Sequence, residues 1–285
     1  MLVEQIISDG KIITRNKVQV AIDRLRAFEP DEGYYLAFSG GKDSVVIKAL
    51  AEMAGVKYDA HYCLTTVDPP ELVRFIKDIH PDVEIIRPKE TMWQLIVKKG
   101  MPPTRLVRYC CKELKESTGI GRIVITGVRW DESAARKKNR NLIDIGNLKT
   151  GIVYNVDNEE SRRMVEQCYR TKKTLVNPII DWLDEEVWEF IKQYNISYCC
   201  LYDEGWKRLG CIGCPMAGKQ RKAEFERWPT YKKAYFRAFE KLIENRKKNG
   251  LPCDYKYESA VNMFAWWMEE KVFPKTMEEQ IDMEE

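Results

Sequence analysis

The chain has 285 residues, of which 44% are hydrophobic and 32% are charged, so it has enough hydrophobic residues for a core and enough charge to be soluble. Its formal net charge of +3 is too small to indicate nucleic-acid binding by itself. No hydrophobic run approaches the length that crosses a membrane, and the first residues carry no signal-peptide pattern. We therefore expect a cytoplasmic protein of one large domain, or of one domain with an appendage, and no membrane partner.

The N-terminal part of the chain has the pattern of a helix. Residues 17–28 carry hydrophobic side chains at roughly helical spacing, which predicts a helix packed outside the first strand. We therefore expect residues 1–29 to form an N-terminal helical segment ahead of the main domain.

A strand, a glycine-rich turn and a helix are predicted next. Residues 34–38 form a short hydrophobic run typical of a buried strand, and residues 44–52 have helical spacing. Between them, Gly40 and Gly41 tolerate a sharp turn. Such a turn directs several backbone N–H groups and the positive end of the helix dipole at one point, where Lys42 adds a full charge. The stretch therefore predicts an anion site, and phosphate is the anion that suits it best.

Strands and helices alternate over residues 30–200, which predicts a mostly parallel α/β sheet. The further strands are expected at 59–64, 83–86, 122–127 and 175–178, and the further helices at 71–80, 91–99 and 184–194. Ligands of such sheets lie at the carboxyl ends of the strands. The glycine-rich loop and the turns after Leu64 and Gly127 should therefore share one edge of the sheet.

Two stretches are rich in positive charge. Residues 131–173 are a charged excursion from the strand–helix pattern, interpreted either as a solvated surface or as a basic flap over an anionic substrate. Residues 219–248 hold eleven Lys/Arg against four Glu, with aromatic residues at helical spacing that we expect to pack inward. Within the C-terminal region, residues 201–285, the excess charge then lies outside, where it can meet the phosphates of DNA or tRNA.

Nine cysteines in a cytoplasmic chain indicate metal ligands, catalytic thiols or buried residues rather than disulfides. Cys211 and Cys214 form a Cys-x-x-Cys turn, which places two thiolates on one metal. The adjacent pair Cys110 and Cys111 would complete a set of four. Four thiolates suit either Zn²⁺ or a [4Fe–4S] cluster.

A second adjacent pair, Cys199 and Cys200, offers a rival set of ligands. In that set Cys200 joins the Cys-x-x-Cys turn as a local zinc knuckle, and spacing alone does not choose between the two sets. Cys63, at the end of a predicted strand, and Cys168, in the charged excursion, are interpreted as structural.

Several segments resemble one family in the same order. The loop Ser39-Gly40-Gly41-Lys42-Asp43-Ser44 resembles the PP-loop of ATP pyrophosphatases and sulfonucleotide reductases. The Cys-Cys pair followed at long range by Cys-x-x-Cys resembles the cluster ligands of assimilatory adenylylsulfate reductases and of their DndC-type DNA-phosphorothioation relatives. Residues 126–136, 178–188 and 201–211 also resemble motifs of this phosphoadenylylsulfate (PAPS) reductase family. The resemblance covers roughly residues 33–215.

The resemblance implies a mostly parallel, doubly wound sheet of the adenine nucleotide alpha hydrolase type with a helical C-terminal extension. It implies that ATP, with Mg²⁺, lies across the strand ends, and that Lys42, Asp43, Arg129 and Arg136 act on its phosphates. The implied nucleotide-binding residues are Ser39, Gly40, Gly41, Lys42, Asp43, Ser44, Gly127 and Arg129. The implied ligands of a [4Fe–4S] cluster, with Zn²⁺ as the alternative, are Cys110, Cys111, Cys211 and Cys214.

The chain departs from the sulfonucleotide reductases in two places. Those enzymes carry a catalytic cysteine in a Glu-Cys-Gly-(Leu/Ile)-His motif near the C-terminus, where this chain has Cys253 and no following Gly or His. They also carry Asp-Thr-Gly after the second strand, where this chain has Thr65-Thr66-Val67. Both departures favour an ATP pyrophosphatase that adenylylates an acceptor for sulfur transfer.

Two other functions stay open at this point. One is a true adenylylsulfate or phosphoadenylylsulfate reductase that uses Cys253, and the other is a nucleotide-gated nucleic-acid-binding subunit without turnover. The acceptor is equally open among a DNA phosphate, a tRNA base and a small molecule. Sulfur transfer further implies a partner that donates sulfur, such as a cysteine desulfurase.

Overall fold

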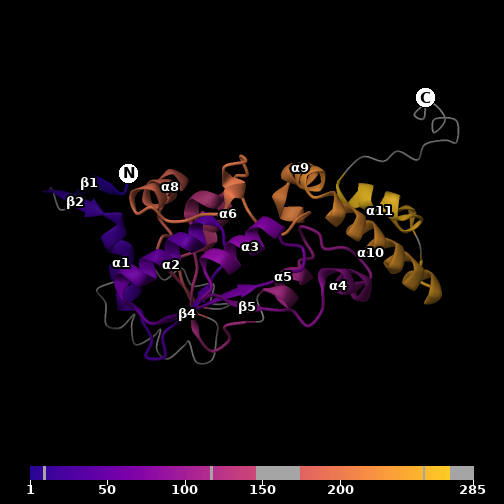
Figure 1. Ribbon diagram of the computed structural model, residues 1–285, viewed down its shortest axis with the longest axis horizontal. Helices are drawn as coiled ribbons and strands as arrows, with labels where there is room; N and C mark the ends of the chain where they lie inside the picture. The colour runs from indigo at the N-terminus through magenta and orange to yellow at the C-terminus, as the bar shows by residue number, and fades with distance from the viewer. Residues whose placement is uncertain (9–10, 116–117, 146–173, 253, 270–285) are drawn as a thin grey trace. The chain divides into compact units, whose positions relative to one another are not determined.

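The structure is a computed structural model that describes residues 1–285 apart from 9–10, 116–117, 146–173, 253 and 270–285 (Figure 1). The chain divides into two compact units, each made of segments that are separate in sequence. Unit 1 contains residues 1–63, 70–86 and 116–210, and unit 2 contains residues 64–69, 87–115 and 211–285.

A six-stranded sheet forms the centre of unit 1, with the strand order β5-β4-β3-β6-β8-β7. Five strands run parallel, and only β7 pairs antiparallel with its neighbour β8. The prediction of a mostly parallel α/β sheet is therefore confirmed. The strands are β3 (Tyr34–Ala37), β4 (Tyr58–Cys63), β5 (Glu84–Ile86), β6 (Ile123–Ile125), β7 (Ile143–Ile145) and β8 (Thr174–Val176).

The sheet changes direction between β3 and β6. The strands β4 and β5 follow β3 on one side of the sheet. On the other side, β8 lies next to β6, and β7 lies at the edge. The two central strands are buried: Leu36 and Ile125, which pair in register, are both inaccessible to solvent. A change of direction of this kind leaves a crevice at the carboxyl ends of the two strands, where ligands of open α/β sheets bind.

Helices of unit 1 cover the sheet, and α2 packs against both α1 and α8 (Figure 1). The helix α2 begins at Lys42, two residues earlier than the sequence predicts, so Lys42 and Asp43 lie in its first turn. The helices of this unit are α1 (Lys17–Ala27), α2 (Lys42–Ala54), α3 (Pro70–Ile79), α6 (Ala134–Asn139) and α8 (Asp184–Gln193), with short 3₁₀ turns η1 (Trp130–Glu132) and η2 (Cys200–Tyr202).

The N-terminal segment is not helical throughout, which corrects the prediction for residues 1–29. An antiparallel hairpin of β1 (Val3–Ser8) and β2 (Lys11–Asn16) precedes α1. Its strands are rich in Val, Ile and Thr, which favour extended backbone. The side chain of Asn16 then caps α1 by accepting hydrogen bonds from the amides of Val18 and Gln19.

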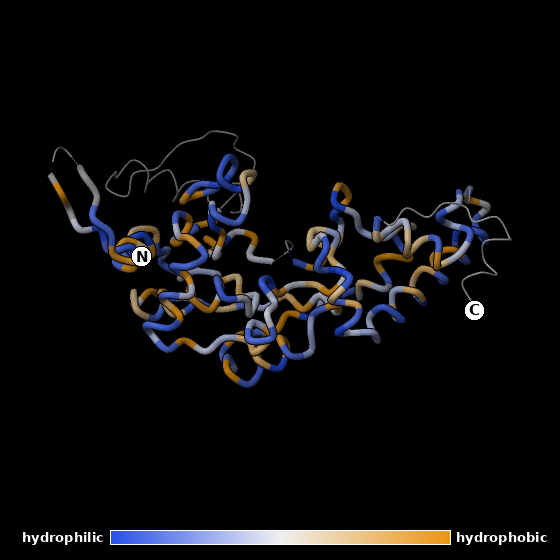
Figure 2. Tube along the Cα trace, turned by 90° about the horizontal axis from the view of Figure 1, so that it is seen from above, coloured by the Kyte–Doolittle hydropathy of each residue, from blue (hydrophilic) through white to orange (hydrophobic). Residues whose placement is uncertain are grey.

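Unit 2 is helical and has an aromatic core. Tyr235, Phe239 and Trp267 are buried and contact one another, and Figure 2 shows hydrophobic and hydrophilic residues alternating along the C-terminal helices. The elements are α4 (Met92–Lys99), α5 (Tyr109–Leu114), α9 (Gln220–Arg227), α10 (Pro229–Lys248) and α11 (Ala260–Trp267), with η3 (Pro215–Ala217) and η4 (Tyr255–Tyr257). None of the helices among the described residues has the length and hydrophobicity to cross a membrane.

Candidate functional site

The loop between β3 and α2 opens onto a cavity of about 580 Å³ in unit 1. The cap residue of α2, Gly41, provides no side-chain acceptor for the first amides of the helix. The amide of Lys42 instead donates a hydrogen bond to the hydroxyl of Tyr202, at 2.9 Å. The loop thus presents the positive end of a 13-residue helix to the cavity, as the sequence pattern predicts for an anion site.

Most of the predicted nucleotide-site residues line this one cavity. The exception is Gly40, whose φ of +72° is accessible to glycine and whose Cα faces α3. A Cβ atom at Gly40 would lie 2.7 Å from Leu72 and 2.9 Å from Ile76, so this glycine lets the loop pack onto α3. The predicted residues in the cavity wall are Ser39, Gly41, Lys42, Asp43, Ser44, Gly127, Arg129 and Arg136.

Two buried cations and two carboxylates form a network in the cavity wall. The side chain of Lys42 contacts Asp184 at 2.9 Å and Asp43 at 3.2 Å. Arg129, which is 1% exposed, contacts Asp43 through Nε at 2.7 Å and Asp184 through Nη2 at 2.8 Å. Although burial opposes ionisation, the hydrogen bond from Lys42 and the charge of Arg129 hold the pKa of Asp184 below its usual range. Asp43 and Asp184 therefore hold both cations in place.

The turn after β6 comes close to the start of α2. A Cβ atom at Gly127 would lie 2.9 Å from the Cβ of Asp43, so only glycine allows this approach. Farther along, Arg136 on α6 forms an ion pair with Glu132, whose carboxylate also accepts the amide of Arg129. Arg136 therefore lines the cavity as a partly exposed cation paired with Glu132, whereas Arg129 is buried in the cavity wall.

Sequence reasoning did not assign several residues of the cavity. Asp184 begins α8, and Tyr202 ends η2 within the run 201–205 that resembles a family motif. The family motifs therefore marked both regions, but not the contacts that Asp184 and Tyr202 make with Lys42. The unassigned charged or polar residues are Thr126, Asp131, Glu132, Asp184, Tyr202, Lys207 and Arg208, which makes five Lys/Arg and four Asp/Glu in the lining.

The four predicted cysteine ligands all belong to unit 2. Cys110 and Cys111 open the short helix α5, and Cys211 and Cys214 flank the turn before η3. All four thiols are free. Next to them, the Cys211 thiol donates to the hydroxyl of Thr65 at 3.4 Å, so the Thr65-Thr66-Val67 turn lies beside this cluster.

The thiols of this cluster are close enough to affect one another. A hydrogen bond with Cys111, burial, and the charges of Cys111, Cys211 and Cys214 raise the pKa of Cys110. The same hydrogen bond, together with Arg108, lowers the pKa of Cys111 to about 5. Within the described part of the chain, no three His, Cys, Asp or Glu side chains are arranged to hold a metal ion. The donor set thus fits a four-cysteine site in composition, without its sulfur atoms converging on one centre.

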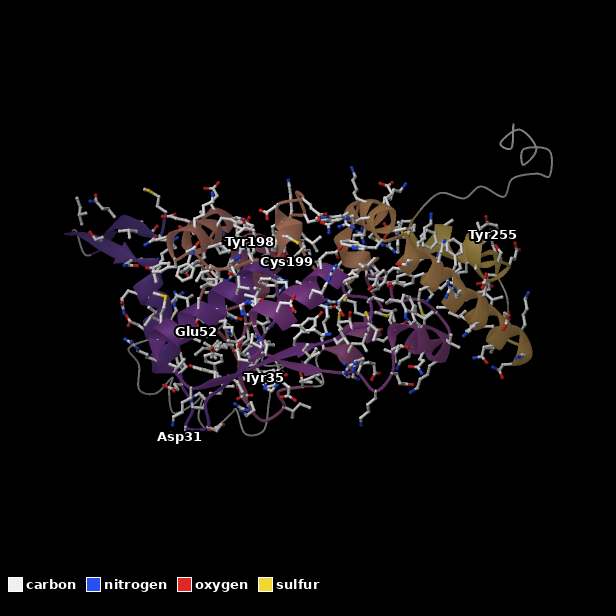
Figure 3. The ribbon with its side chains drawn as sticks, viewed as in Figure 1. Asp31, Tyr35, Glu52, Tyr198, Cys199 and Tyr255 are labelled. Atoms are coloured by element: carbon white, nitrogen blue, oxygen red, sulfur yellow. The ribbon has the colours of Figure 1, made fainter. Side chains whose placement is uncertain are left out.

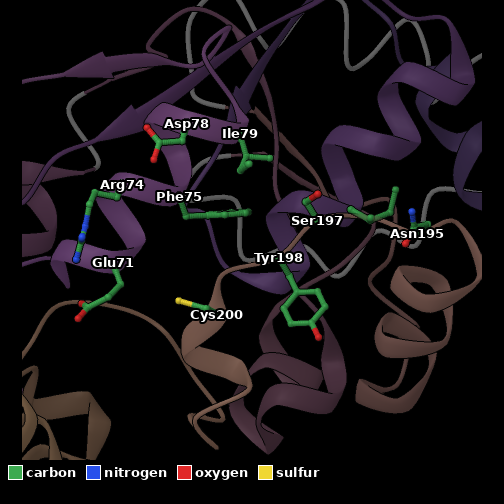
Figure 4. Close-up of a pocket in the computed structure, with 10 residues that line it drawn as sticks. Glu71, Arg74, Phe75, Asp78, Ile79, Asn195, Ser197, Tyr198 and Cys200 are labelled. Atoms are coloured by element: carbon green, nitrogen blue, oxygen red, sulfur yellow. The ribbon is translucent and has the colours of Figure 1, made fainter.

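The rival pair lies elsewhere. Cys199 is buried and Cys200 is exposed, and both belong to unit 1. Cys200 lines a second cavity of about 680 Å³, formed by α3 and the segment after α8 (Figure 4). The zinc knuckle considered from the sequence would need Cys200 of unit 1 with two thiols of unit 2. Cys168 and Cys253 lie outside the described residues.

Together, the topology and the loop define an α/β protein with a cavity at the start of α2, where its sheet changes direction. Residues 33–217 match the phosphoadenosine phosphosulfate reductase domain, and the chain belongs to this family.

Several proteins resemble the chain over part of its length. An uncharacterised protein of Methanocaldococcus jannaschii is 28% identical over 252 residues, which are 85% of this chain and 53% of that protein. An adenosine 5'-phosphosulfate reductase of Oceanobacillus iheyensis is 25% identical over 189 residues, which are 62% of this chain and 69% of that protein. The chain spans only 53% and 41% of the two M. jannaschii proteins it matches.

Among solved structures, the phosphoadenylyl-sulfate reductase from Candida auris, in a phosphate complex, aligns with a TM-score of 0.44 and 19% sequence identity. The alignment covers 67% of this chain and 87% of that one.

Proposed function

We propose that this protein is an ATP pyrophosphatase that activates an acceptor by adenylylation for sulfur transfer. The observation that carries the proposal is the cavity at the β3/β6 crevice. There the start of α2, Lys42 and the buried Arg129 face one space. Backbone amides and fixed cations of this kind suit the polyphosphate of a nucleotide. Membership of the phosphoadenosine phosphosulfate reductase family supports an adenine nucleotide as the ligand.

The reaction needs two displacements. In the first, a nucleophilic atom of the acceptor forms a bond to the α-phosphorus of ATP, the bond to the β-phosphate oxygen breaks, and pyrophosphate leaves. In the second, sulfur at the oxidation level of sulfide forms a bond to the acceptor atom that carries the adenylylated oxygen, the bond from that atom to the oxygen breaks, and AMP leaves with the oxygen and the bonding electrons. A donor such as a cysteine desulfurase delivers sulfur as a persulfide, from which two electrons of an external thiol release it.

Residues of the cavity have distinct roles in the first displacement. The ammonium of Lys42 and the positive end of the α2 dipole bind the departing phosphates, and Arg129 stabilises the charge that develops on them. Arg136, near the cavity mouth, adds a further positive charge. Asp43 orients Lys42 and Arg129 and is the carboxylate available for Mg²⁺. No proton transfer is required of these groups, because pyrophosphate leaves as an anion.

The cysteine cluster of unit 2 is proposed to hold a [4Fe–4S] cluster through Cys110, Cys111, Cys211 and Cys214. Four thiols that act on one another, with Arg108 close by, offer the ligands and the positive charge that such a cluster needs. When bound, a cluster would supply a redox-active, negatively charged centre. Zinc is the alternative occupant, and metal analysis separates the two.

The acceptor is proposed to be a nucleic acid, DNA or tRNA, that binds the outer face of α10. Lys233, Arg237 and Lys241 are exposed and follow at four-residue intervals, about 6 Å apart along the axis. None of the three side chains forms an ion pair with a described residue. Arg221 instead stacks on Trp267, with its guanidinium carbon 4.2 Å from the ring centre, so part of the charge counted in the sequence is internal.

The proposal is tested by two assays on one preparation purified without oxygen. With ATP and a mixture of DNA and tRNA, we expect pyrophosphate release that depends on the nucleic acid. With adenylylsulfate or phosphoadenylylsulfate and thioredoxin, we expect no sulfite. Sulfite release that disappears in Cys253→Ser would instead establish the reductase reaction, which the names of the reductase relatives favour. Nucleic-acid binding gated by ATP without pyrophosphate release would establish the non-catalytic alternative.

A further inference from the structure

Among the described residues, Tyr202 is the one aromatic residue in the wall of the cavity at the start of α2, and its hydroxyl caps that helix. It lies 160 residues from Lys42 in sequence, yet its hydroxyl accepts the first amide of α2 at 2.9 Å. The same hydroxyl would lie 3.4 Å from a Cβ atom at Gly41. The phenol oxygen therefore sits over the Gly41–Lys42 peptide, where a PP-loop of this kind is expected to receive phosphate.

The ring of Tyr202 is held by aromatic neighbours on one side. Trp188 of α8 meets it edge to face with ring centres 5.1 Å apart, and Tyr198 meets it at 6.3 Å. Edge-to-face packing of this kind fixes the plane of a ring. The direction of the Cζ–Oη bond toward the loop is thus set by α8 and by the turn η2, and does not depend on a bound ligand.

The hydroxyl of Tyr202 has a proton without an acceptor. A phenol accepts and donates at the same oxygen, and here the accepted bond comes from Lys42. No other hydrogen bond joins this oxygen to any residue that the structure describes. Burial, and then the charge of Asp43, raise the pKa of Tyr202, so the group keeps its proton at every physiological pH. A donor that faces a cavity of cations and amides is available to an anionic oxygen.

We propose that Tyr202 is a phosphate-binding residue of this site, which donates its hydroxyl hydrogen to a phosphate oxygen of the nucleotide while it still accepts the Lys42 amide. This inference rests on the proposed function, because it needs a nucleotide in the cavity. The helix then acts on the phosphate through the phenol: the accepted bond polarises the O–H group and strengthens the bond that it donates. The phosphate-binding residues would then include one from the segment after α8 in addition to those of the loop.

Tyr198 provides a matched control. It packs edge to face on the same Trp188, at 5.3 Å, but its hydroxyl donates to Asp203 at 2.9 Å. It lines the second cavity (Figure 4), whereas Tyr202 lines the cavity at the start of α2. Figure 3 labels Tyr198 and Cys199, which precede η2 in the sequence. Tyr198→Phe and Tyr202→Phe thus remove the same atom from two neighbouring rings, only one of which faces the loop.

The test is calorimetric binding of ATP, pyrophosphate and adenosine to the full chain and to both variants. We expect Tyr202→Phe to weaken ATP and pyrophosphate binding about ten- to a hundredfold, the range for a lost hydrogen bond to a charged group. Tyr198→Phe should bind all three ligands like the unmutated chain. Adenosine, which has no phosphate, should bind all three proteins alike, and a purely structural role of the hydroxyl would not produce this difference between ligands.

Equal or tighter ATP binding by Tyr202→Phe would overturn the inference, since the hydroxyl would then be idle or would compete with phosphate. Weaker adenosine binding by the same margin would also overturn it, because the loss would then be structural. If the unmutated chain bound neither ATP nor pyrophosphate, the proposed function itself would fail and the inference with it. The first two results leave the proposed function intact.

Discussion

The cations of the cavity at the start of α2 are paired with carboxylates in the absence of a ligand. Lys42 is only 7% exposed, and its ammonium is shared between Asp43 and Asp184. A buried cation without partners is costly, so the two carboxylates keep the site folded when it is empty. They also fix the geometry in which the cations meet a phosphate, which lowers the cost of ordering on binding.

Replacing Lys42 by methionine should abolish most of the ATP-dependent pyrophosphate release. The loss of one charge-assisted phosphate contact corresponds to about 1.5–3 kcal/mol, or roughly ten- to a hundredfold in kcat/KM. The control is Lys48→Met on the same helix, because Lys48 is equally buried but pairs with Asp82 and Glu52 outside the cavity. Equal activities of the two variants would remove Lys42 from the mechanism.

Asp181 should make the stability of unit 1 depend on pH. It binds Arg24 through two hydrogen bonds of 2.7 and 3.1 Å and Arg15 through one of 2.6 Å, and its side chain is 14% exposed. Although burial opposes ionisation, the bond from Arg24 lowers the pKa of Asp181 below the unfolded value of 3.8. Its stabilisation is therefore fully present above that value and is lost as the pH falls through the lower folded value.

The Asp181→Asn variant measures this contribution. At pH 7 we expect a loss of about 2 kcal/mol in the free energy of unfolding in urea, the size of hydrogen bonds to a charged group. The difference from the unmutated chain should shrink steadily below pH 4. A difference that stays constant down to pH 2 would show that the ionised carboxylate is not what stabilises the fold.

At the scale of elements, the site depends on close contact between the turn after β6 and the start of α2. The sequence of each segment favours its own turn or helix. The distance between the two segments depends on the absence of a side chain at Gly127. The contact brings Arg129 to Asp43, and the start of α8 then brings Asp184 to both cations. Three elements distant in sequence therefore hold four charged side chains in one arrangement.

A methyl group at Gly127 should separate these elements. Because its carbon would lie 2.9–3.0 Å from Asp43, Gly127→Ala forces a backbone shift, and overpacking of this kind costs about 1–3 kcal/mol. We expect a lower urea midpoint and weaker ATP binding. Gly210→Ala is the control, since its nearest contact is the end of the Arg208 side chain at 4.0 Å. An unchanged midpoint in Gly127→Ala would mean that the contact is not tight.

The two candidate sets of cysteine ligands lie on different elements and can be told apart by substitution. In protein purified without oxygen, we expect iron, sulfide and a broad absorption band of a [4Fe–4S] cluster, which is lost in Cys110→Ser, Cys111→Ser, Cys211→Ser and Cys214→Ser. Cys199→Ser and Cys200→Ser should retain it. Zinc in place of iron, or metal that depends on Cys200 and not on Cys111, would favour the local knuckle.

For the whole molecule, the net charge of +3 hides an uneven distribution. On α10, Lys233, Arg237 and Lys241 form no ion pair with a described residue, while most cations of the cavity in unit 1 are paired with carboxylates. A surface that binds nucleic acid through phosphates releases counterions, and its affinity falls as salt rises because that release becomes less favourable. The expected behaviour is therefore binding that weakens steeply between low and moderate salt and shows little sequence preference.

The triple variant Lys233→Gln, Arg237→Gln and Lys241→Gln should weaken binding of DNA or tRNA and reduce the slope of log affinity against log salt by up to about 3, close to one unit for each lost phosphate contact. Filter binding at several salt concentrations measures both quantities. A control triple of exposed lysines from separate elements of unit 1, at positions 57, 77 and 192, should change neither. Equal slopes for the two triples would remove α10 from the interface.

The sequence alone determined the alternation of strands and helices around the sheet, apart from β7, and the glycine-rich turn before α2, and it predicted a set of cysteine ligands. Each of these depends on short-range patterns: hydrophobic periodicity, the tolerance of Gly40 for positive φ, and the spacing of a Cys-x-x-Cys turn. The hairpin β1–β2 was not predicted, because the helical pattern of residues 17–28 was extended to the whole N-terminal segment. The roles of Asp184 and Tyr202 could not be predicted, since no local pattern links residues 142 and 160 positions from Lys42 to its ammonium and amide. Only the tertiary structure decided those contacts, because charges and helix ends are compensated by whichever groups the packing of α8 and η2 brings within hydrogen-bond distance.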